Sequence, residues 1–184
     1  MNPDIFTVSF FGHRELRRFN EIEARIYEIA ARLIWKMNMV EFLVGRDGDF
    51  DQLVSSTVRI AKRNEWSKNS WLILVLPYMR REYKENKKEF ESYYDDIYFE
   101  PDERVYPKAA ITMRNRWMVD QSNLCVFCVE RDHGGAWQTM QYAKRKSKLI
   151  VNIWDEKDHE ELLSRLDKYG KQLNFHRIYA LPRV

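Results

Sequence analysis

Short apolar runs of strand length alternate with amphipathic stretches of helix length, and this alternation constrains the fold more than any other feature of the sequence. Apolar, β-branched and aromatic runs predict strands at 5–11, 40–44, 71–76, 95–99, 124–129 and 149–154. Apolar residues at spacings of three and four predict helices at 20–38, 50–63, 109–122, 137–145 and 159–169. The pattern predicts an α/β protein with a single Rossmann-like, doubly wound, mainly parallel sheet of about six strands flanked by helices.

The remaining stretch, 78–91, is dense in Lys, Arg and Glu, and we interpret it as a solvated loop or a frayed helix. The chain has 184 residues, which fits one domain over residues 1–184. Its longest apolar run, 71–76, is far shorter than the ~20 residues that cross a bilayer, so no membrane is expected as a partner. The start of the chain has no basic segment leading into an apolar one, and the cytoplasm is therefore the expected location.

Both cysteines of the chain, Cys125 and Cys128, lie in one predicted strand. Side chains three residues apart on a strand point to opposite faces, so we expect no disulfide between them. A metal site would need a second pair of ligands, and none of the four histidines stands at a suitable spacing. We interpret both as buried core thiols and expect no metal.

Three predicted strands end in loops that combine glycine with polar residues, at 12–14, 45–49 and 133–135. Ligands of open α/β sheets bind beyond the carboxyl ends of the strands, so we expect Gly12, Gly45 and Gly134 around one crevice. Glycine lets a backbone N–H approach a ligand, and a following helix N-terminus favours anions, so these loops suit phosphate. Neither a P-loop nor a dinucleotide-binding fingerprint is present, which removes the main support for an ATPase or an ordinary dehydrogenase.

The same loops belong to longer motifs that occur in a fixed order. These are FFGHR at 10–14, GRDGDFD at 45–51, RNRWMVD at 114–120 and GGAWQT at 134–139. In this order they resemble the YpsA-like branch of the SLOG superfamily, which is related to the LOG, or lysine decarboxylase-like, phosphoribohydrolases. The resemblance extends over residues 5–154. It implies a Rossmann-like sheet and a pocket for a nucleotide or a nucleotide-derived ligand.

The resemblance also implies which residues bind the ligand. They are Gly12, His13 and Arg14 in the first loop, Gly45, Asp47 and Asp49 in the second, and Arg114, Arg116, Gly134, Gly135 and Thr139 in the last two motifs. An arginine can hold a phosphate through two parallel hydrogen bonds. Because Arg114 and Arg116 stand two apart on a predicted helix, we expect one to face the ligand and the other to anchor structure. Pairing of either with Asp120 or Glu130 is the alternative.

The resemblance implies one acidic residue for catalysis that is missing at the matching position of this sequence. LOG-type enzymes place a Glu just after their glycine loop, whereas the matching stretch here, 139–142, has no acidic residue. His13, Asp47, Asp49 and Asp120 remain as sources of an acid or base. No catalytic residue is assigned, and binding is favoured over catalysis.

The first functional hypothesis is a cytoplasmic protein that binds a phosphate-bearing and ribose-bearing nucleotide derivative, as a sensor, carrier or sequestering module. No cofactor is expected, and the net charge of only +3 gives no reason to expect nucleic acid as the partner. One alternative is a LOG-like hydrolase of the N-glycosidic bond of a nucleotide. The other is a protein-interaction scaffold that uses the charged stretch 80–91. A homodimer or higher oligomer stays open.

Overall fold

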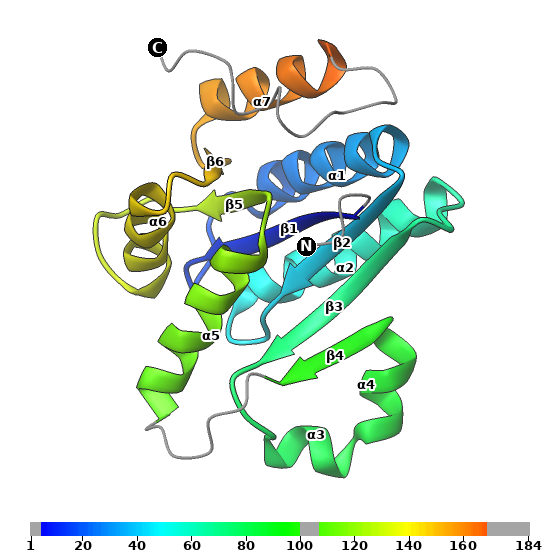
Figure 1. The fold of residues 1–184 in the computed structure, drawn as a ribbon, viewed down its shortest axis with the longest axis vertical. Helices are drawn as coiled ribbons and strands as arrows, with labels where there is room; N and C mark the ends of the chain where they lie inside the picture. The colour runs from blue at the N-terminus through cyan, green and yellow to red at the C-terminus, as the bar shows by residue number, and fades with distance from the viewer. Residues whose placement is uncertain (1–4, 100–106, 169–184) are drawn as a thin grey trace.

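The fold is one parallel sheet with helices on both faces. The computed structural model describes residues 5–99 and 107–168. Neighbouring strands all run parallel, in the order β4-β3-β2-β1-β5-β6 (Figure 1). The strands are β1 (Ile5–Gly12), β2 (Met39–Val44), β3 (Ser70–Leu76), β4 (Asp96–Phe99), β5 (Leu124–Cys128) and β6 (Leu149–Asn152). This confirms the predicted six-stranded α/β architecture.

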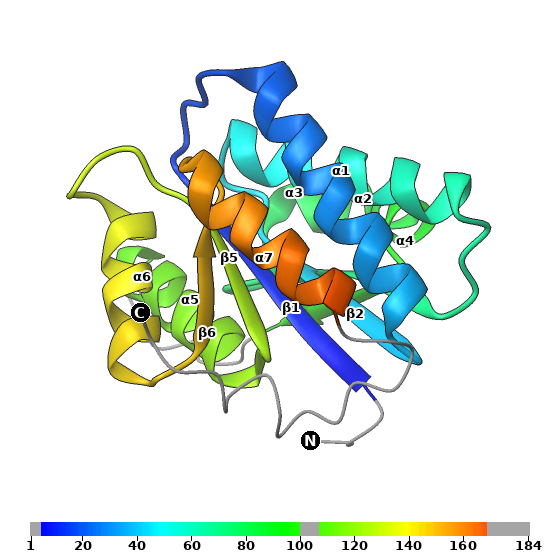
Figure 2. The ribbon, with the colours of Figure 1, turned by 90° about the horizontal axis from the view of Figure 1, so that it is seen from above.

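The main helices form one layer on each face of the sheet (Figure 2). On one face α1 packs between α2 and α7, and on the other face α5 packs against α6. The bounds are α1 (Phe19–Lys36), α2 (Asp49–Asn64), α5 (Pro107–Gln121), α6 (Gly135–Arg145) and α7 (Glu156–Lys168). Each layer covers its own apolar core.

Strand β5 shows how the two cores are separated. Its successive side chains alternate between the faces, so Cys125 packs into the core under α5 and α6. Cys128 packs into the larger core under α1, α2 and α7. Both thiols are free and buried, as the sequence predicts, and burial raises the pKa of each to about 12.

The stretch 78–91 is more ordered than the loop or frayed helix expected for it. It contains α3 (Arg81–Glu85) and the start of α4 (Lys87–Tyr93). The reason is a small aromatic cluster, because the buried ring of Tyr83 lies edge-on to Phe90 at 5.6 Å and to Phe99 at 5.1 Å. In the sequence these aromatic residues are separated by many charged ones, so no apolar pattern indicates that the segment is packed.

No helix in the part of the chain that the structure describes has the length and apolar character needed to cross a bilayer. The longest apolar run of the sequence, 71–76, lies instead within strand β3 of the sheet.

The order of the strands determines where a ligand site can form. From β1 the chain proceeds outward through β2, β3 and β4, and it then returns to place β5 on the other side of β1. The connections on the two sides of β1 therefore lie on opposite faces of the sheet. In doubly wound folds this switch point leaves a crevice at the carboxyl ends of the central strands.

Candidate functional site

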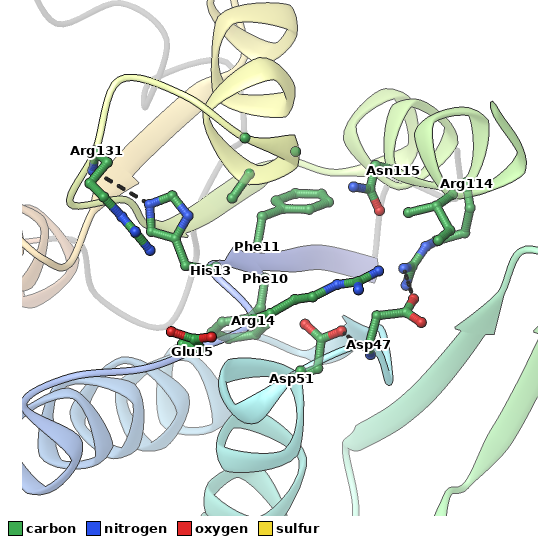
Figure 3. A pocket seen from close by; sticks show the side chains of 16 residues that line it. Phe10, Phe11, His13, Arg14, Glu15, Asp47, Asp51, Arg114, Asn115 and Arg131 are labelled. Atoms are coloured by element: carbon green, nitrogen blue, oxygen red, sulfur yellow. Dashed lines mark hydrogen bonds and ion pairs between the residues drawn. The ribbon is translucent and has the colours of Figure 1, made fainter. Parts of the chain in front are cut away.

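A crevice with a volume of about 550 Å³ opens at this switch point, at the carboxyl edge of the sheet (Figure 3). Its walls come from the segments that follow β1, β2 and β5 and from one side of α5. Of the eleven residues implied by the family resemblance, the structure places seven in these walls: Gly12, His13, Arg14, Asp47, Arg114, Gly134 and Gly135. The other four, Gly45, Asp49, Arg116 and Thr139, do not line the crevice.

Two of those four lie beside the loop after β2. Gly45 lies directly beneath a pair of charged groups, since a Cβ there would overlap the guanidinium of Arg114 and the carboxylate of Asp51. Asp49 is the first residue of α2 and is exposed. Its carboxylate accepts a hydrogen bond from the backbone N–H of Leu16 at 3.4 Å. Both residues thus support the crevice from outside.

The other two lie between α5 and α6. Arg116 is exposed and its guanidinium lies over the ring of Tyr142, 5.4 Å from the ring centre. Thr139 is buried, donates a hydrogen bond to the carbonyl of Gly135 at 2.8 Å, and accepts one from Nδ2 of Asn115 at 3.3 Å. Its hydroxyl therefore ties the two helices together.

Arg114 has internal partners instead of a free guanidinium. Its side chain is only 4% exposed, and its Nη2 donates to Oδ2 of Asp47 at 2.8 Å. Its Nη1 donates to the carbonyl of Val75 at 3.2 Å, which fastens α5 to the end of β3. Arg80 pairs with the other oxygen of Asp47 at 2.5 Å. Two arginines thus share one carboxylate, and the charges of Asp47 and of the nearby Asp51 oppose the charge of Arg114.

The alternative considered from the sequence, in which Arg114 pairs with Asp120 or Glu130, is wrong. Asp120 instead accepts a hydrogen bond from the hydroxyl of Tyr142 at 2.8 Å, and Glu130 lies near the exposed Arg17 at 3.8 Å. The partner of Arg114 is Asp47, which follows a different strand.

A second carboxylate, Asp51, completes this wall of the crevice. Its Oδ2 accepts a hydrogen bond from the backbone N–H of Asp47 at 2.8 Å. Burial raises the pKa of Asp51 above its ordinary value, and the nearby charge of Arg114 opposes that rise. The wall therefore offers carboxylate oxygens whose charge is offset by the two arginines.

His13 on the opposite wall is held in its neutral form. Its Nε2 accepts a hydrogen bond from the backbone N–H of Arg131 at 3.4 Å, which requires an unprotonated nitrogen. Burial lowers the pKa of His13, and the adjacent charge of Arg131 lowers it further. His13 consequently adds no positive charge to the crevice at neutral pH.

The available positive charge comes from Arg14 and Arg131. Both are exposed, and across residues 5–99 and 107–168 neither guanidinium makes an ion pair or a hydrogen bond. Figure 3 shows the side chain of Arg14 extending across the crevice toward the acidic wall. These two groups can therefore bind an anion without first breaking an internal contact.

The N-terminus of α6 lies in the same wall as Arg131. Gly134 has φ +90°, a conformation that favours glycine, and no side chain caps the helix. The first intrahelical bond of this turn runs from Gln138 N–H to the Gly134 carbonyl, so the earlier N–H groups lack helical partners. A Cβ added at Gly135 would meet nothing within 4 Å, so these groups are reachable. Such a terminus suits an anion.

Sequence reasoning missed several side chains of the crevice. Signals for them were present, because Arg131 stands in the polar turn after β5 and Asn115 stands between the two arginines of the third motif. Asp51 closes the second motif, and Glu15 follows the first. Asn115 and Asp51 thus lie within the motifs of the family resemblance, whereas Arg131 and Glu15 lie in loops beyond strand ends.

We predict that Gly12→Ala lowers the free energy of unfolding by about 1–3 kcal/mol, measured by urea denaturation. The added methyl would overlap the ring of Phe50, which is buried in the core and has no room to move. Gly135→Ala is the matched control at the same crevice, because its added methyl enters open space at the start of a helix. Equal stability of the two variants would contradict the close packing of Gly12.

Comparisons with known proteins give a fold and no family. No protein-family model matches the sequence, and no curated protein sequence matches it significantly. DNA processing protein A (DprA) from Streptococcus pneumoniae is similar in structure, with a TM-score of 0.57 and 16% identity. The match covers 88% of this chain and 56% of that one, so this chain spans about half the length of that relative. DNA processing protein A from Helicobacter pylori matches with a TM-score of 0.58 and 14% identity, over 95% and 78% of the two chains.

At 14–16% identity these likenesses show the fold alone, and they carry no information on the YpsA-like branch. They correct the expected ligand. The Helicobacter pylori protein is described as having a unique single-stranded DNA binding mode. The expectation of a small nucleotide-derived ligand, with nucleic acid as an unlikely partner, is therefore wrong for this fold. Its physical weakness was the use of net charge, which ignores how charge is distributed.

Proposed function

We propose that the protein binds single-stranded DNA and that the crevice holds one nucleotide unit of the strand. The observation that carries this proposal is the pair of unpartnered guanidinium groups of Arg14 and Arg131, which line the same crevice as the uncapped N-terminus of α6. A fold similar to that of a protein described as binding single-stranded DNA supports the same ligand class.

The cationic wall suits the phosphate of the strand. Arg131 and the first N–H groups of α6 lie on one side, and Arg14 reaches in from the loop after β1. Arginine and helix N-termini are common phosphate contacts in protein complexes with DNA. Because neither guanidinium has an internal partner, binding requires no exchange of ion pairs.

The acidic wall suits the edge of a base. Asp47 and Asp51 line this wall, and each of their carboxylate oxygens has a second lone pair that can accept a hydrogen bond from a base N–H group. The two walls therefore orient a nucleotide with its phosphate toward α6 and its base toward α2. A volume of about 550 Å³ is that of a small-molecule pocket, so the crevice can enclose a single nucleotide but not a double helix.

We also propose a family, a domain extent and a cellular location for the protein. The order and content of the four motifs support a SLOG-type domain of the YpsA-like branch, which we propose to comprise residues 1–184. We propose the cytoplasm as its location. Each of the four motifs contributes residues to the crevice walls, among them Arg14, Asp47, Arg114 and Gly134.

Fluorescence anisotropy with a labelled oligothymidylate of about 20 nucleotides tests the proposal. We expect the wild-type protein to bind this strand, and we expect Arg131→Ala to weaken binding by about tenfold, the effect of one lost charge-assisted contact. Arg116→Ala is the control, because it removes the same charge from a side of α5 that faces Tyr142.

Competition separates the ligand classes. The unlabelled strand should displace the labelled one, whereas a duplex of the same length and a nucleoside monophosphate should do so poorly. Equal competition by the duplex, or equal affinities of the Arg131→Ala and Arg116→Ala variants, would show that the crevice is not a single-strand site.

A further inference from the structure

A second groove lies at the opposite edge of the sheet, between the C-terminal ends of α1 and α2. It has a volume of about 470 Å³. Trp35 and Lys36 line it from α1, and Trp66 and Lys68 line it from the turn after α2. Two tryptophans and two lysines at one surface groove form a combination that the crevice does not explain.

Trp66 is held outward in a conformation that suits glycine. Its φ is +50°, and 89% of its surface is exposed. It follows the C-cap of α2 in a Schellman motif, in which Ser67 N–H donates to the Lys62 carbonyl at 2.9 Å and Trp66 N–H donates to the Arg63 carbonyl at 3.2 Å. A large aromatic residue at this position strains the backbone and gains almost no burial. The ring is thus presented to solvent.

Trp35 faces the same groove and is fixed from behind. Its side chain is 61% exposed, and its indole N–H donates a hydrogen bond to Oε2 of Glu65. The hydroxyl of Tyr27 donates to the other oxygen of Glu65 at 3.3 Å. These contacts hold one indole in place and leave its face open.

The lysines add unpaired positive charge. Neither Lys36 nor Lys68 makes an ion pair or a hydrogen bond with its side chain in the ranges 5–99 and 107–168. Glu65 is the one acidic residue of the groove lining, and it is already bonded to Trp35 and Tyr27. The groove therefore combines open aromatic faces with free cations, which is the chemistry that single-stranded nucleic acid uses for stacking and phosphate contact.

We propose that this groove is a second contact for single-stranded nucleic acid, with a base stacked on Trp66 and the backbone beside Lys36 and Lys68. The ligand class rests on the proposed function, but the residues are separate from those of the crevice. Strand β1 has eight residues, so at about 3.3 Å per residue the two edges lie roughly 26 Å apart. A long strand can contact both edges and a very short one only one.

Trp66→Gly tests the inference without weakening the fold. Glycine is the residue best suited to φ +50° at this position, so the thermal midpoint should stay equal or rise. We expect affinity for an oligothymidylate of about 20 nucleotides to fall between about fivefold and tenfold, the lower range for loss of one stacked base. Ser147→Gly is the matched control, since Ser147 occupies the same position at the end of α6 with φ +54° and has no aromatic ring.

The outcomes separate this groove from the crevice. Loss of affinity in Trp66→Gly but not in Ser147→Gly supports the groove, and a loss in Arg131→Ala reports on the crevice independently. Unchanged affinity in Trp66→Gly overturns the inference while the crevice can still stand. A wild-type dimer that becomes a monomer in Trp66→Gly, with unchanged affinity for the strand, would assign the groove to a second copy and overturn it as well.

Discussion

Replacement of Arg114 by Met lowers the free energy of unfolding by about 3 kcal/mol, the lower end of the range for removing one partner of a buried ion pair. Methionine keeps much of the volume of the arginine stem and removes the charge. Asp47 would then keep only Arg80 as a partner, and the half-buried Asp51 would lose the charge that offsets it. Urea denaturation followed by circular dichroism measures the change.

Two further variants isolate the cause. Arg116→Ala removes the other arginine of the same helix and should change stability by less than about 0.5 kcal/mol, because that side chain is exposed. Asp51→Asn combined with Arg114→Met should recover part of the loss, since Arg80 still pairs with Asp47 and the double variant no longer leaves an uncompensated carboxylate at residue 51. A small effect of Arg114→Met, comparable with that of Arg116→Ala, would disprove the structural role of the ion pair.

The location of the crevice was predictable because it depends only on strand direction. Gly12 ends β1 and Gly134 follows β5, and the carboxyl ends of neighbouring parallel strands must meet at one edge. Helical period likewise indicates that Arg114 and Arg116 lie on different sides of α5. Neither inference needs any knowledge of long-range contacts.

The partner of Arg114 was not predictable in the same way. Asp47 is 67 residues away in the sequence, and their contact depends on how α5 crosses the ends of β2 and β3. The helical period indicates a side of α5 but does not indicate which acid lies opposite. This is why the local candidates Asp120 and Glu130 were wrong.

The ligand class was missed for a chemical reason. Glycine loops, a helix N-terminus and arginines recognise phosphate, and a mononucleotide and a strand present the same phosphate group. A protein that binds a strand differs from one that binds a mononucleotide in having a contact surface that extends beyond one nucleotide. Trp66 illustrates this, because a tryptophan after a helix gives no hint in the sequence that its ring is 89% exposed.

Reversing both free cations of the crevice, Arg14→Glu with Arg131→Glu, abolishes measurable strand binding, with at least about a hundredfold loss of affinity if each contact contributes a factor of ten. Each reversal also places a repelling charge beside the phosphate. Neither residue has an internal partner in the described ranges, so the fold should be unaffected and the thermal midpoint should be preserved.

A control must show that the loss of affinity does not come from the change in net charge alone. Arg116→Glu with Arg145→Glu is the matched control, because it also changes the net charge from +3 to −1 but lies outside the crevice lining. We expect this control to keep most of its affinity. Titrations at several salt concentrations add a second readout, since each lost phosphate contact should reduce the salt slope of single-strand binding by about 0.7. Equal losses and equal slopes in the two double variants would mean that the strand senses only the overall charge and that Arg14 and Arg131 form no site.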